Sequence, residues 1–308
     1  METEFVRWLR DRLPESPCLK LGPGDDAAIL ALSGDPNVVV TTDLLTEGVD
    51  FHLAQDDPRR IGRKSLAVNL SDLAAMAARP LAAVVAVALP KEGGGGRSAL
   101  ELAVALYEGL LPLAAEFDLA IAGGDTNTFD GPLVISATLF GQLTERGPLT
   151  RSGGRPGDRL LVTGVLGGSI LGHSFDFTPR VREALSLAER YELHAGMDIS
   201  DGLALDLSRL AEASGCGAVV RTDWVPVSPA ARQLAGDDAA IALRHALSDG
   251  EDFELLLAVP PDAAEAMLAD QPLDCPLTCV GELVAGSGLW QQSAGGELMP
   301  LEPIGWLH

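Results

Sequence analysis

The sequence predicts an α/β (α+β) protein built from two domains. Its 308 residues are enough for two hydrophobic cores of ordinary size. Apolar residues make up 47% of the chain and aromatic residues only 5%, which favours mixed layers that pack through Ala, Leu and Val. The 34 Gly and 20 Pro residues lie at turns rather than in one low-complexity block, which indicates many tight connections between short elements.

Helical and strand patterns alternate through the first half. Apolar residues recur at helical spacing up to Leu13, which predicts an N-terminal helix. Two short apolar runs at 27–32 and 38–41 predict strands by their length and β-branching. Residues 59–78 then have the composition of one long helix.

A capping box predicts where the next helix begins. Ser98 is followed three residues later by Glu101, and the helical pattern continues through Leu110. Further strands are predicted at 81–90, 119–122 and 132–143, with a flexible glycine loop at 93–96.

A turn-rich segment at 144–157 separates the two halves. We therefore predict one domain at 1–148 and a second at 149–308. In the second half the patterns predict strands at 159–163, 218–221, 253–259 and 277–283, and helices at 179–191 and 200–213.

The charge of the chain restricts its partners. Lys and Arg number 22 against 44 Asp and Glu, a formal charge of −22. Such a surface repels nucleic acid and anionic membranes, and the longest apolar run, 81–89, is far short of a membrane span. We therefore predict no nucleic-acid partner and no membrane partner.

The N-terminal sequence and the cysteines favour a cytoplasmic protein. The first residues are charged and amphipathic, unlike a secretory signal. The cysteines have no spacing that would complete a zinc site, so we expect reduced thiols. They are Cys18, Cys216, Cys275 and Cys279.

Aspartates recur where apolar runs end in short Gly, Thr or Ser turns. Carboxylate oxygens are the ligands that Mg²⁺ prefers, and Thr41 and Thr42 add hydroxyl or carbonyl oxygens beside one of them. The pattern predicts a polyvalent metal site, and Mg²⁺ in turn favours a phosphorylated substrate. The aspartates concerned are Asp25, Asp26, Asp43, Asp72, Asp125, Asp198 and Asp201.

Asp72 belongs to a helix whose other residues are apolar almost all round. Ser65, Asn69 and Asp72 form its one polar stripe. The stripe could simply face solvent, but a helix this apolar is expected to be buried, and a buried carboxylate needs a partner or a metal.

The other aspartates also have structural alternatives. Asp26 could be a solvated turn residue, and Asp125 could belong to a turn after two glycines. Asp43 follows a strand pattern, at a position where open α/β sheets carry functional groups. Asp198 and Asp201 could cap a helix that begins near Ser200, where a phosphate could also bind.

Several familiar catalytic motifs are absent from the sequence. There is no phosphate-binding G-x-x-x-x-G-K-[ST] loop, no protein-kinase motif set and no G-x-S-x-G. A phosphate monoester acceptor needs neither a poised nucleophile nor a histidine base, because its second pKa is about 6. Transfer to such an oxygen requires charge neutralisation and in-line positioning.

With these residues identified, the chain resembles the thiamine-monophosphate kinase family, in the superfamily of aminoimidazole-ribonucleotide synthetase and selenophosphate synthetase. The resemblance covers nearly the whole chain and rests on GPGDDAAIL, TTDLLTEGVDF, KSLAVNLSDLAAM, GGDTN, LTRSGGRPGD, DISDGLALDL and LSDGEDFELL. It implies ATP- and Mg²⁺-dependent phosphorylation of thiamine monophosphate to thiamine diphosphate by direct transfer, the last step of thiamine diphosphate biosynthesis.

The resemblance also implies a fold, an assembly and residue roles. The fold is the two-domain aminoimidazole-ribonucleotide synthetase-like fold, with N-terminal domains that form a β-barrel across a homodimer and ATP near the interface. Implied metal ligands are Asp26, Thr41, Thr42, Asp43, Asp72, Asp125, Asp198 and Asp201. Implied ATP contacts are Gly124, Asp125, Arg151 and Ser200, and implied catalytic residues are Asp43, Asp198 and Arg151.

Implied substrate contacts are Asp50, Glu251 and Trp306. Asp50 stands where the family often has His, and the segment 165–193 is shorter than in the family. Trp306 could stack on the substrate rings or close the edge of the core. Two other functions stay open: another ATP-dependent synthetase of this superfamily that activates an oxygen as phosphate, and a non-catalytic nucleotide or metal sensor.

Overall fold

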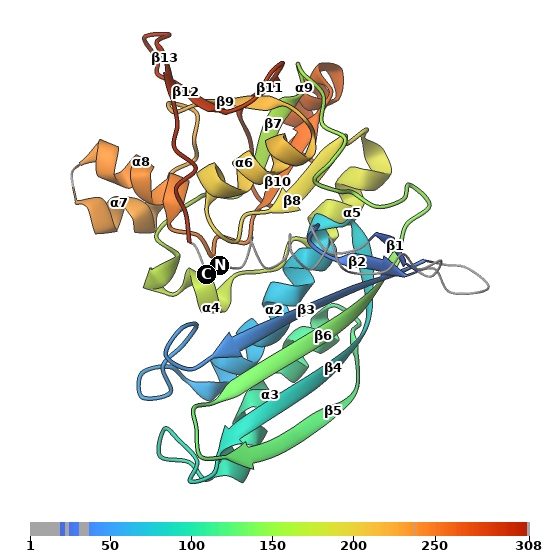
Figure 1. Cartoon of the computed structure of the whole chain (residues 1–308), viewed down its shortest axis with the longest axis vertical. Coiled ribbons are helices and arrows are strands. Elements are labelled where there is room, and N and C mark those ends of the chain that lie inside the picture. Colours follow the sequence, from blue (N-terminus) through green and yellow to red (C-terminus); the bar gives the residue numbers. More distant parts are fainter. Residues whose placement is uncertain (1–18, 22–24, 31–36, 237, 307–308) are drawn as a thin grey trace.

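The protein consists of two sheets, one in each half of the chain (Figure 1). The computed structural model describes residues 19–21, 25–30, 37–236 and 238–306. The helix predicted before Leu13, and Cys18, lie outside these residues. The described cysteines are free thiols, as expected. No helix among the described residues combines the length and the apolar character needed to cross a membrane.

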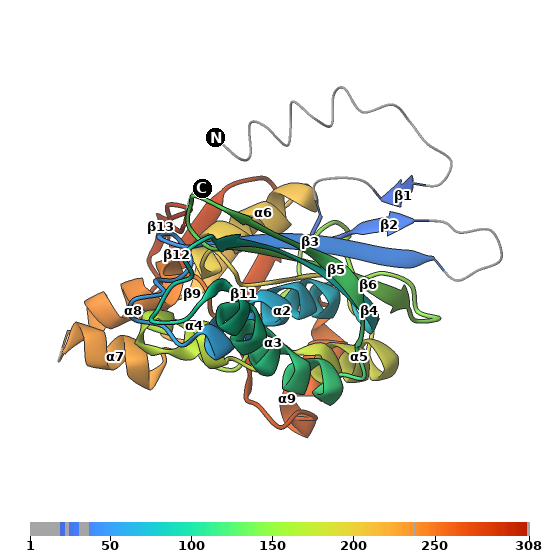
Figure 2. The same cartoon turned by 90° about the horizontal axis from the view of Figure 1, so that it is seen from below.

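The first half is a six-stranded sheet with helices on one face (Figure 2). Its strand order is β1-β2-β3-β6-β4-β5, and β4 and β5 are its one parallel pair. The elements are β1 (Leu19–Leu21), β2 (Ala28–Leu30), β3 (Val38–Thr46), α2 (Pro58–Ala75), β4 (Ala78–Pro90), α3 (Ala99–Glu116), β5 (Ala120–Phe129) and β6 (Val134–Leu143).

The two helices begin at clear sequence signals. α2 starts after Asp57, whose side chain accepts a hydrogen bond from the backbone N of Arg59. The capping box predicted at Ser98 and Glu101 is present at the start of α3. The prediction placed the end of α2 at residue 78, which is wrong. The helix ends at Ala75 because the backbone reverses at Ala77 (φ 50°) into β4.

Two strands extend past the turns that were predicted to end them. β3 continues to Thr46 and β5 to Phe129, so Asp43 and Asp125 lie within strands. Continuous pairing explains the error, because β3 pairs with β6 along its whole length and β5 follows β4 through both glycines. A turn-type composition is overridden here by the neighbouring strand.

The second half is a seven-stranded sheet with the order β13-β12-β9-β11-β7-β10-β8. Its strands are β7 (Arg159–Thr163), β8 (Ala195–Asp198), β9 (Gly217–Arg221), β10 (Leu255–Val259), β11 (Leu277–Val284), β12 (Leu289–Gln292) and β13 (Leu298–Pro300). Its helical elements are η1 (Ser169–Leu171), α4 (His173–Asp176), α5 (Val181–Arg190), α6 (Leu203–Ala213), α7 (Pro229–Ala235), α8 (Ala239–Ser248) and α9 (Pro261–Asp270).

The predicted strand 159–163 matches β7, but the helix start predicted at residue 200 is wrong. α6 begins at Leu203, after Gly202 at φ 117°. The backbone N–H groups of Asp201 and Gly202 donate to the side chain of Asp206, at 2.9 and 3.0 Å. Asp198 and Asp201 are therefore not the caps of this helix. A carboxylate inside its first turn has that role.

Helix α2 is the element on which the two halves meet. It packs on α3, β3 and β6 of its own half, and on α4, α5 and β8 of the other. One hydrophobic cluster accordingly contains residues of both halves, such as Leu70 of α2, Leu139 of β6, Val181 of α5 and Leu257 of β10. The burial predicted for this helix is confirmed, and its polar residues Lys64, Ser65, Asn69 and Ser71 are buried with it.

Candidate active site

Three of the predicted aspartates converge at the junction of the halves. One carboxylate oxygen from each of Asp26, Asp72 and Asp198 lies within 4.8 Å of the other two. Asp26 precedes β2, Asp72 is near the end of α2, and Asp198 ends β8. The cluster therefore draws on both sheets and on the helix between them.

Hydroxyl groups hold these carboxylates in place. Ser71 donates a hydrogen bond to Oδ2 of Asp198 at 2.5 Å. Thr41 donates to Oδ2 of Asp72, and its hydroxyl lies 3.5 Å from the backbone carbonyl of Asp26. Thr41 is 6% exposed because alternate residues of β3 face the helices. Asp43 shares this face of the strand by the same alternation.

The electrostatics of the cluster are those of an anionic site in need of a cation. Burial, the charge of Asp43 and the charge of Asp198 raise the pKa of Asp72 well above its ordinary value. Burial and the charge of Asp26 do the same to the pKa of Asp198. Carboxylates arranged in this way repel one another until protons or a metal ion neutralise them.

Arg151 is the basic residue that contacts the aspartate cluster. Its guanidinium contacts both oxygens of Asp26, at 2.5 and 3.2 Å. Its backbone N–H points to Asp25, whose pKa is raised to about 6 by burial and by the charge of Asp26. Arg151 thus reaches the group of Asp26, Asp72 and Asp198, which we call the metal-type cluster, from the segment that joins the two sheets.

The loop between β8 and α6 forms another wall of the site. Asp201 forms an ion pair with Arg209 at 2.5 Å, and its backbone carbonyl accepts a hydrogen bond from the backbone N of Trp306. The Trp306 residue is 53% exposed, so it does not close the core edge. Asp206 was missed by the sequence analysis. It is fully buried, and burial together with the charge of Asp201 raises its pKa to about 7.

Thr42, Gly124 and Asp125 lie apart from the cluster within one chain. Asp43 and Gly124 occupy one row across the sheet, but β6 and β4 separate their strands, which corresponds to about 14 Å. The side chain of Thr42 is on the opposite face, where its hydroxyl lies 2.9 Å from that of Thr138. Asp125 shares a row with Leu44, which also points to that open face.

The predicted substrate residues Asp50 and Glu251 meet at a residue that the sequence analysis missed. The Lys64 ammonium lies 2.5 Å from Oε1 of Glu251 and 3.2 Å from the backbone carbonyl of Asp50. The Asp50 carboxylate accepts a hydrogen bond from the backbone N of Thr46. Lys64 is only 1% exposed. Its position in a helix already predicted to be buried was the signal that could have identified it.

The segment 165–193 borders the second cluster, which consists of Lys64, Glu251 and Asp50. Arg60 of α2 forms an ion pair with Asp176 at 2.6 Å, and Arg63 donates to the backbone carbonyl of Phe175 at 2.8 Å. The Phe175 ring lies 5.0 Å from the ammonium nitrogen of Lys64. The segment is therefore attached to α2 beside the predicted substrate residues.

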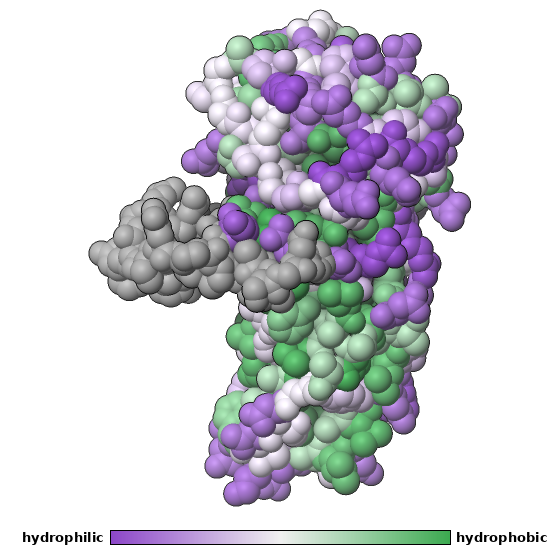
Figure 3. Space-filling model, turned by 90° about the vertical axis from the view of Figure 1, so that its right-hand side faces the viewer, coloured by the Kyte–Doolittle hydropathy of each residue, from purple (hydrophilic) through white to green (hydrophobic). Residues whose placement is uncertain are grey.

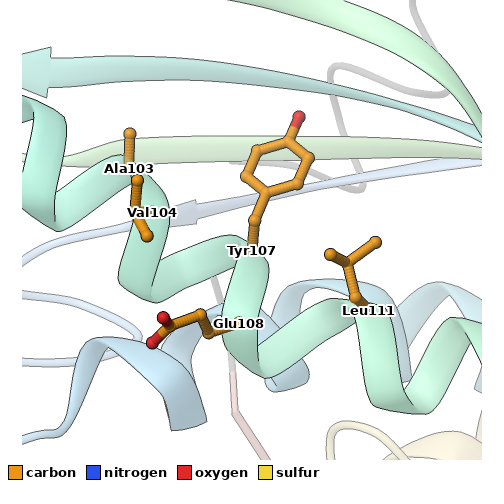
Figure 4. A pocket seen from close by; sticks show the side chains of 5 residues that line it. All are labelled: Ala103, Val104, Tyr107, Glu108 and Leu111. Atoms are coloured by element: carbon orange, nitrogen blue, oxygen red, sulfur yellow. The ribbon is translucent and has the colours of Figure 1, made fainter.

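A shallow pocket on α3 is separate from both clusters (Figure 4). It is lined by Ala103, Val104, Tyr107, Glu108 and Leu111. None of the predicted site residues lines it, so we assign it no role.

Comparisons with known proteins agree with this arrangement. The families described as AIR synthase related protein, N-terminal domain, and AIR synthase related protein, C-terminal domain, match residues 24–143 and 155–289. The thiamine-monophosphate kinase of Rhodopirellula baltica is 42% identical over 315 residues, which cover 100% of this chain and 97% of that protein.

Solved structures of similar proteins share the fold over nearly the whole chain. Thiamine-monophosphate kinase from Stenotrophomonas maltophilia K279a is 34% identical with a TM-score of 0.74, covering 96% of this chain and 95% of that one. AaThiL complexed with AMPPCP and TMP is 27% identical with a TM-score of 0.79, covering 99% and 96%. The chain therefore belongs to the thiamine-monophosphate kinase family of AIR synthase related proteins.

Proposed function

We propose that the protein transfers the γ-phosphoryl group of ATP to thiamine monophosphate, giving thiamine diphosphate and ADP. The observation that carries the proposal is the convergence of Asp26, Asp72 and Asp198 beside Arg151. The chain that builds this cluster is 42% identical to a thiamine-monophosphate kinase along its full length. The AaThiL complex with AMPPCP, an ATP analogue, and TMP supports the same pair of substrates.

Mg²⁺ fits the residues of the cluster. Asp26, Asp72 and Asp198 would hold it, with Asp43 and Thr41 beside them as further oxygen donors. The donor set consists of hard oxygen atoms, and a bound divalent cation would relieve the repulsion between the carboxylates. When bound, Mg²⁺ neutralises charge on the phosphoryl group during its transfer.

The chain's own residues would position the reactants rather than supply a nucleophile. An oxygen of the acceptor phosphate attacks the γ-phosphorus while the bond from that phosphorus to ADP breaks. The acceptor is largely dianionic near neutral pH, since its second pKa is about 6, so no protein base is required. Arg151 would clamp the phosphates, and Ser200 lies on the adjacent loop.

The substrate's ring portion would bind at the far end of the junction. Glu251 is 39% exposed at its side chain, and Asp50 is joined to it through Lys64. Trp306 is the third proposed contact; its backbone N donates to the Asp201 carbonyl, and the residue is 53% exposed. These three residues remain our proposal for the substrate side of the site.

We also propose that the active unit is a homodimer whose N-terminal sheets close into a barrel. The open face of the first sheet carries exposed apolar side chains, including Leu44 (60%) and Phe129 (41%), and β5 is an exposed edge strand. Figure 3 shows apolar residues over much of this half of the molecule. A long exposed edge beside an apolar face favours pairing with a second copy.

Such a dimer would also complete the site. Gly124 and Asp125 lie on the edge strand β5, too far from Asp43 to act with it in the same chain. Closure of the two sheets would bring Asp125 of the partner subunit toward β3. The predicted roles of Gly124, Asp125 and Thr42 in ATP and metal binding therefore depend on the dimer.

The test is ADP release from ATP and Mg²⁺ with thiamine monophosphate, with free thiamine and with no acceptor. We expect release only with the monophosphate. Asp198→Asn should lower kcat by more than about 100-fold, since ligand loss removes several kcal/mol of charge stabilisation. Asp274→Asn, an exposed carboxylate in the turn before β11, should leave kcat unchanged. Equal turnover of Asp198→Asn and wild type would contradict the proposed site.

A further inference from the structure

Lys64 is a buried charge with no role in the reaction described above. Its side chain is 1% exposed, although lysine is almost never fully buried without a partner. The partner is Glu251, whose side chain remains 39% exposed. The ammonium end of this ion pair is therefore buried, whereas the carboxylate end is accessible to solvent. The asymmetry indicates that the pair presents Glu251 outward.

Three separate segments converge on the Lys64 ammonium group. Glu251 comes from the loop before β10, the Asp50 carbonyl from the turn after β3, and the Phe175 ring from α4. A cation 5.0 Å from a ring centroid is within range of a favourable cation–π contact. Lys64 therefore joins the walls of the site on both sides of the junction.

The loop that carries Glu251 is held in a conformation that its sequence alone would not favour. Glu251 (φ 54°) and Phe253 (φ 50°) are non-glycine residues in the left-handed region, which costs roughly 1–2 kcal/mol each. Backbone hydrogen bonds to Ser200 and Ile199, at 2.7 and 2.8 Å, support this conformation. Strained residues that the surroundings enforce are typical of ligand-binding sites.

Helix α2 relates this pair to the metal-type cluster. Lys64 precedes Ser71 by seven residues, about two helical turns, so these two residues lie on one side of the helix; Asp72 follows at eight residues. The separation along the axis is about 12 Å. A single rigid element thus carries groups at the phosphate end of the site and at the opposite end.

We propose that Lys64 is a positioning residue for the acceptor: its ammonium group fixes the Glu251 carboxylate, so that the free oxygen receives an amino group on the ring portion of the substrate. The inference rests on the proposed function. Lys64 itself touches no reacting atom. By neutralising Glu251 it also makes that residue a directed hydrogen-bond acceptor rather than one more anion in an acidic chain.

The experiment is steady-state kinetics with thiamine monophosphate and ATP varied separately. Lys64→Met should raise the KM for thiamine monophosphate by roughly tenfold or more, because the Glu251 carboxylate is then no longer held in the orientation that binds the substrate. The KM for ATP and kcat should change far less. Lys64→Arg, which keeps the charge, should restore part of the loss. Arg60→Gln is the matched control, since it removes another α2 contact with α4 but leaves Glu251 untouched.

A double-mutant cycle with Glu251→Gln separates positioning from a purely structural role. If Lys64 acts through Glu251, Lys64→Met adds nothing to KM in the Glu251→Gln background. Multiplying effects, or an unchanged KM for thiamine monophosphate in a folded Lys64→Met protein, would overturn the proposal while wild-type turnover stands. If Lys64→Met does not fold, Lys64→Arg and Glu251→Gln still form a cycle. Absence of acceptor-dependent turnover in the wild type would instead overturn the proposed function together with this inference.

Discussion

Replacing Asp72 by Asn should stabilise the protein in the absence of Mg²⁺. The oxygens of Asp26, Asp72 and Asp198 lie within 4.8 Å of one another, which corresponds to about 3.5 kcal/mol of repulsion per charged pair at an effective dielectric constant of about 20. Protonation limits the penalty. Holding a proton at pH 7 on an acid of ordinary pKa about 3.9 costs roughly 4 kcal/mol. We expect Asp72→Asn to gain about 2–4 kcal/mol.

The pH dependence of this gain follows from the raised pKa of Asp72. The native carboxyl holds its proton at a pH where the unfolded one has lost it, so wild-type stability falls as pH rises above about 4. The gain of Asp72→Asn should therefore be largest near neutral pH and should vanish near pH 4. Thr41 can still donate to the amide oxygen, so the variant keeps this contact.

The assay is thermal and urea unfolding with EDTA and then with Mg²⁺. For a chain of 308 residues, a gain of about 2–4 kcal/mol should raise Tm by roughly 3–6 °C without the metal. Mg²⁺ should stabilise the wild type by mass action and the variant less. The difference in Tm between the two proteins should therefore shrink or change sign when Mg²⁺ is added. Asp274→Asn, with the same change of charge, should show neither effect. An Asp72→Asn protein that is less stable than wild type, with an undiminished Mg²⁺ response, would exclude repulsion at Asp72 as a source of instability.

Three further predictions concern other parts of the structure. The native pKa of Asp206, about 7, exceeds its unfolded value, so this carboxyl lowers the free energy of unfolding as pH rises from 4 to 7. In urea unfolding, Asp206→Asn should reduce that loss by up to roughly 4 kcal/mol. An unchanged pH dependence would exclude Asp206 as the cause of the loss. Glu251→Gln should lower the free energy of unfolding by about 3 kcal/mol, because it leaves the buried Lys64 ammonium without its anionic partner. Lys64→Met should lower it by less than about 1 kcal/mol, because the Glu251 carboxylate that remains is partly exposed. Equal losses in the two variants would contradict this difference in burial. Leu44→Glu on the open sheet face should yield monomers in sedimentation equilibrium, whereas Leu100→Glu on α3 should not; dimers of both would place the interface elsewhere.

Much of the metal-type cluster was predictable because its residues sit in strongly patterned elements. The helix around Asp72 is apolar on nearly every side, so its burial followed from periodicity, and its carboxylate had to face a partner. The surface-stripe alternative is wrong, since Ser65 and Asn69 are buried at 2% and 0% exposure. Asp26 and Asp198 were found through their local motifs.

Local patterns failed where a neighbouring strand decides the structure. Asp43 and Asp125 were predicted at strand ends, and pairing with β6 and β4 places them inside β3 and β5. That error matters, because the alternation of a strand decides which face each carboxylate uses. The separation of Asp125 from the cluster depends on the strand order of the sheet, which no local pattern encodes.

Lys64 was missed for a related reason. Its contacts join residue 64 to residues 50, 175 and 251, so they depend on how the two halves assemble. The sequence does show a lysine within a buried helix, which is enough to demand an acidic partner. It does not show that the partner is Glu251, one of the predicted substrate residues.

Phosphorus-31 NMR of the reaction of ATP, Mg²⁺ and thiamine monophosphate follows the γ-phosphoryl group itself, so it shows whether that group reaches the acceptor phosphate. We expect two coupled diphosphate resonances of thiamine diphosphate that grow in equal amount with ADP, with no accumulation of inorganic phosphate. ADP accompanied by inorganic phosphate, with the thiamine monophosphate resonance unchanged, would contradict transfer to the acceptor phosphate.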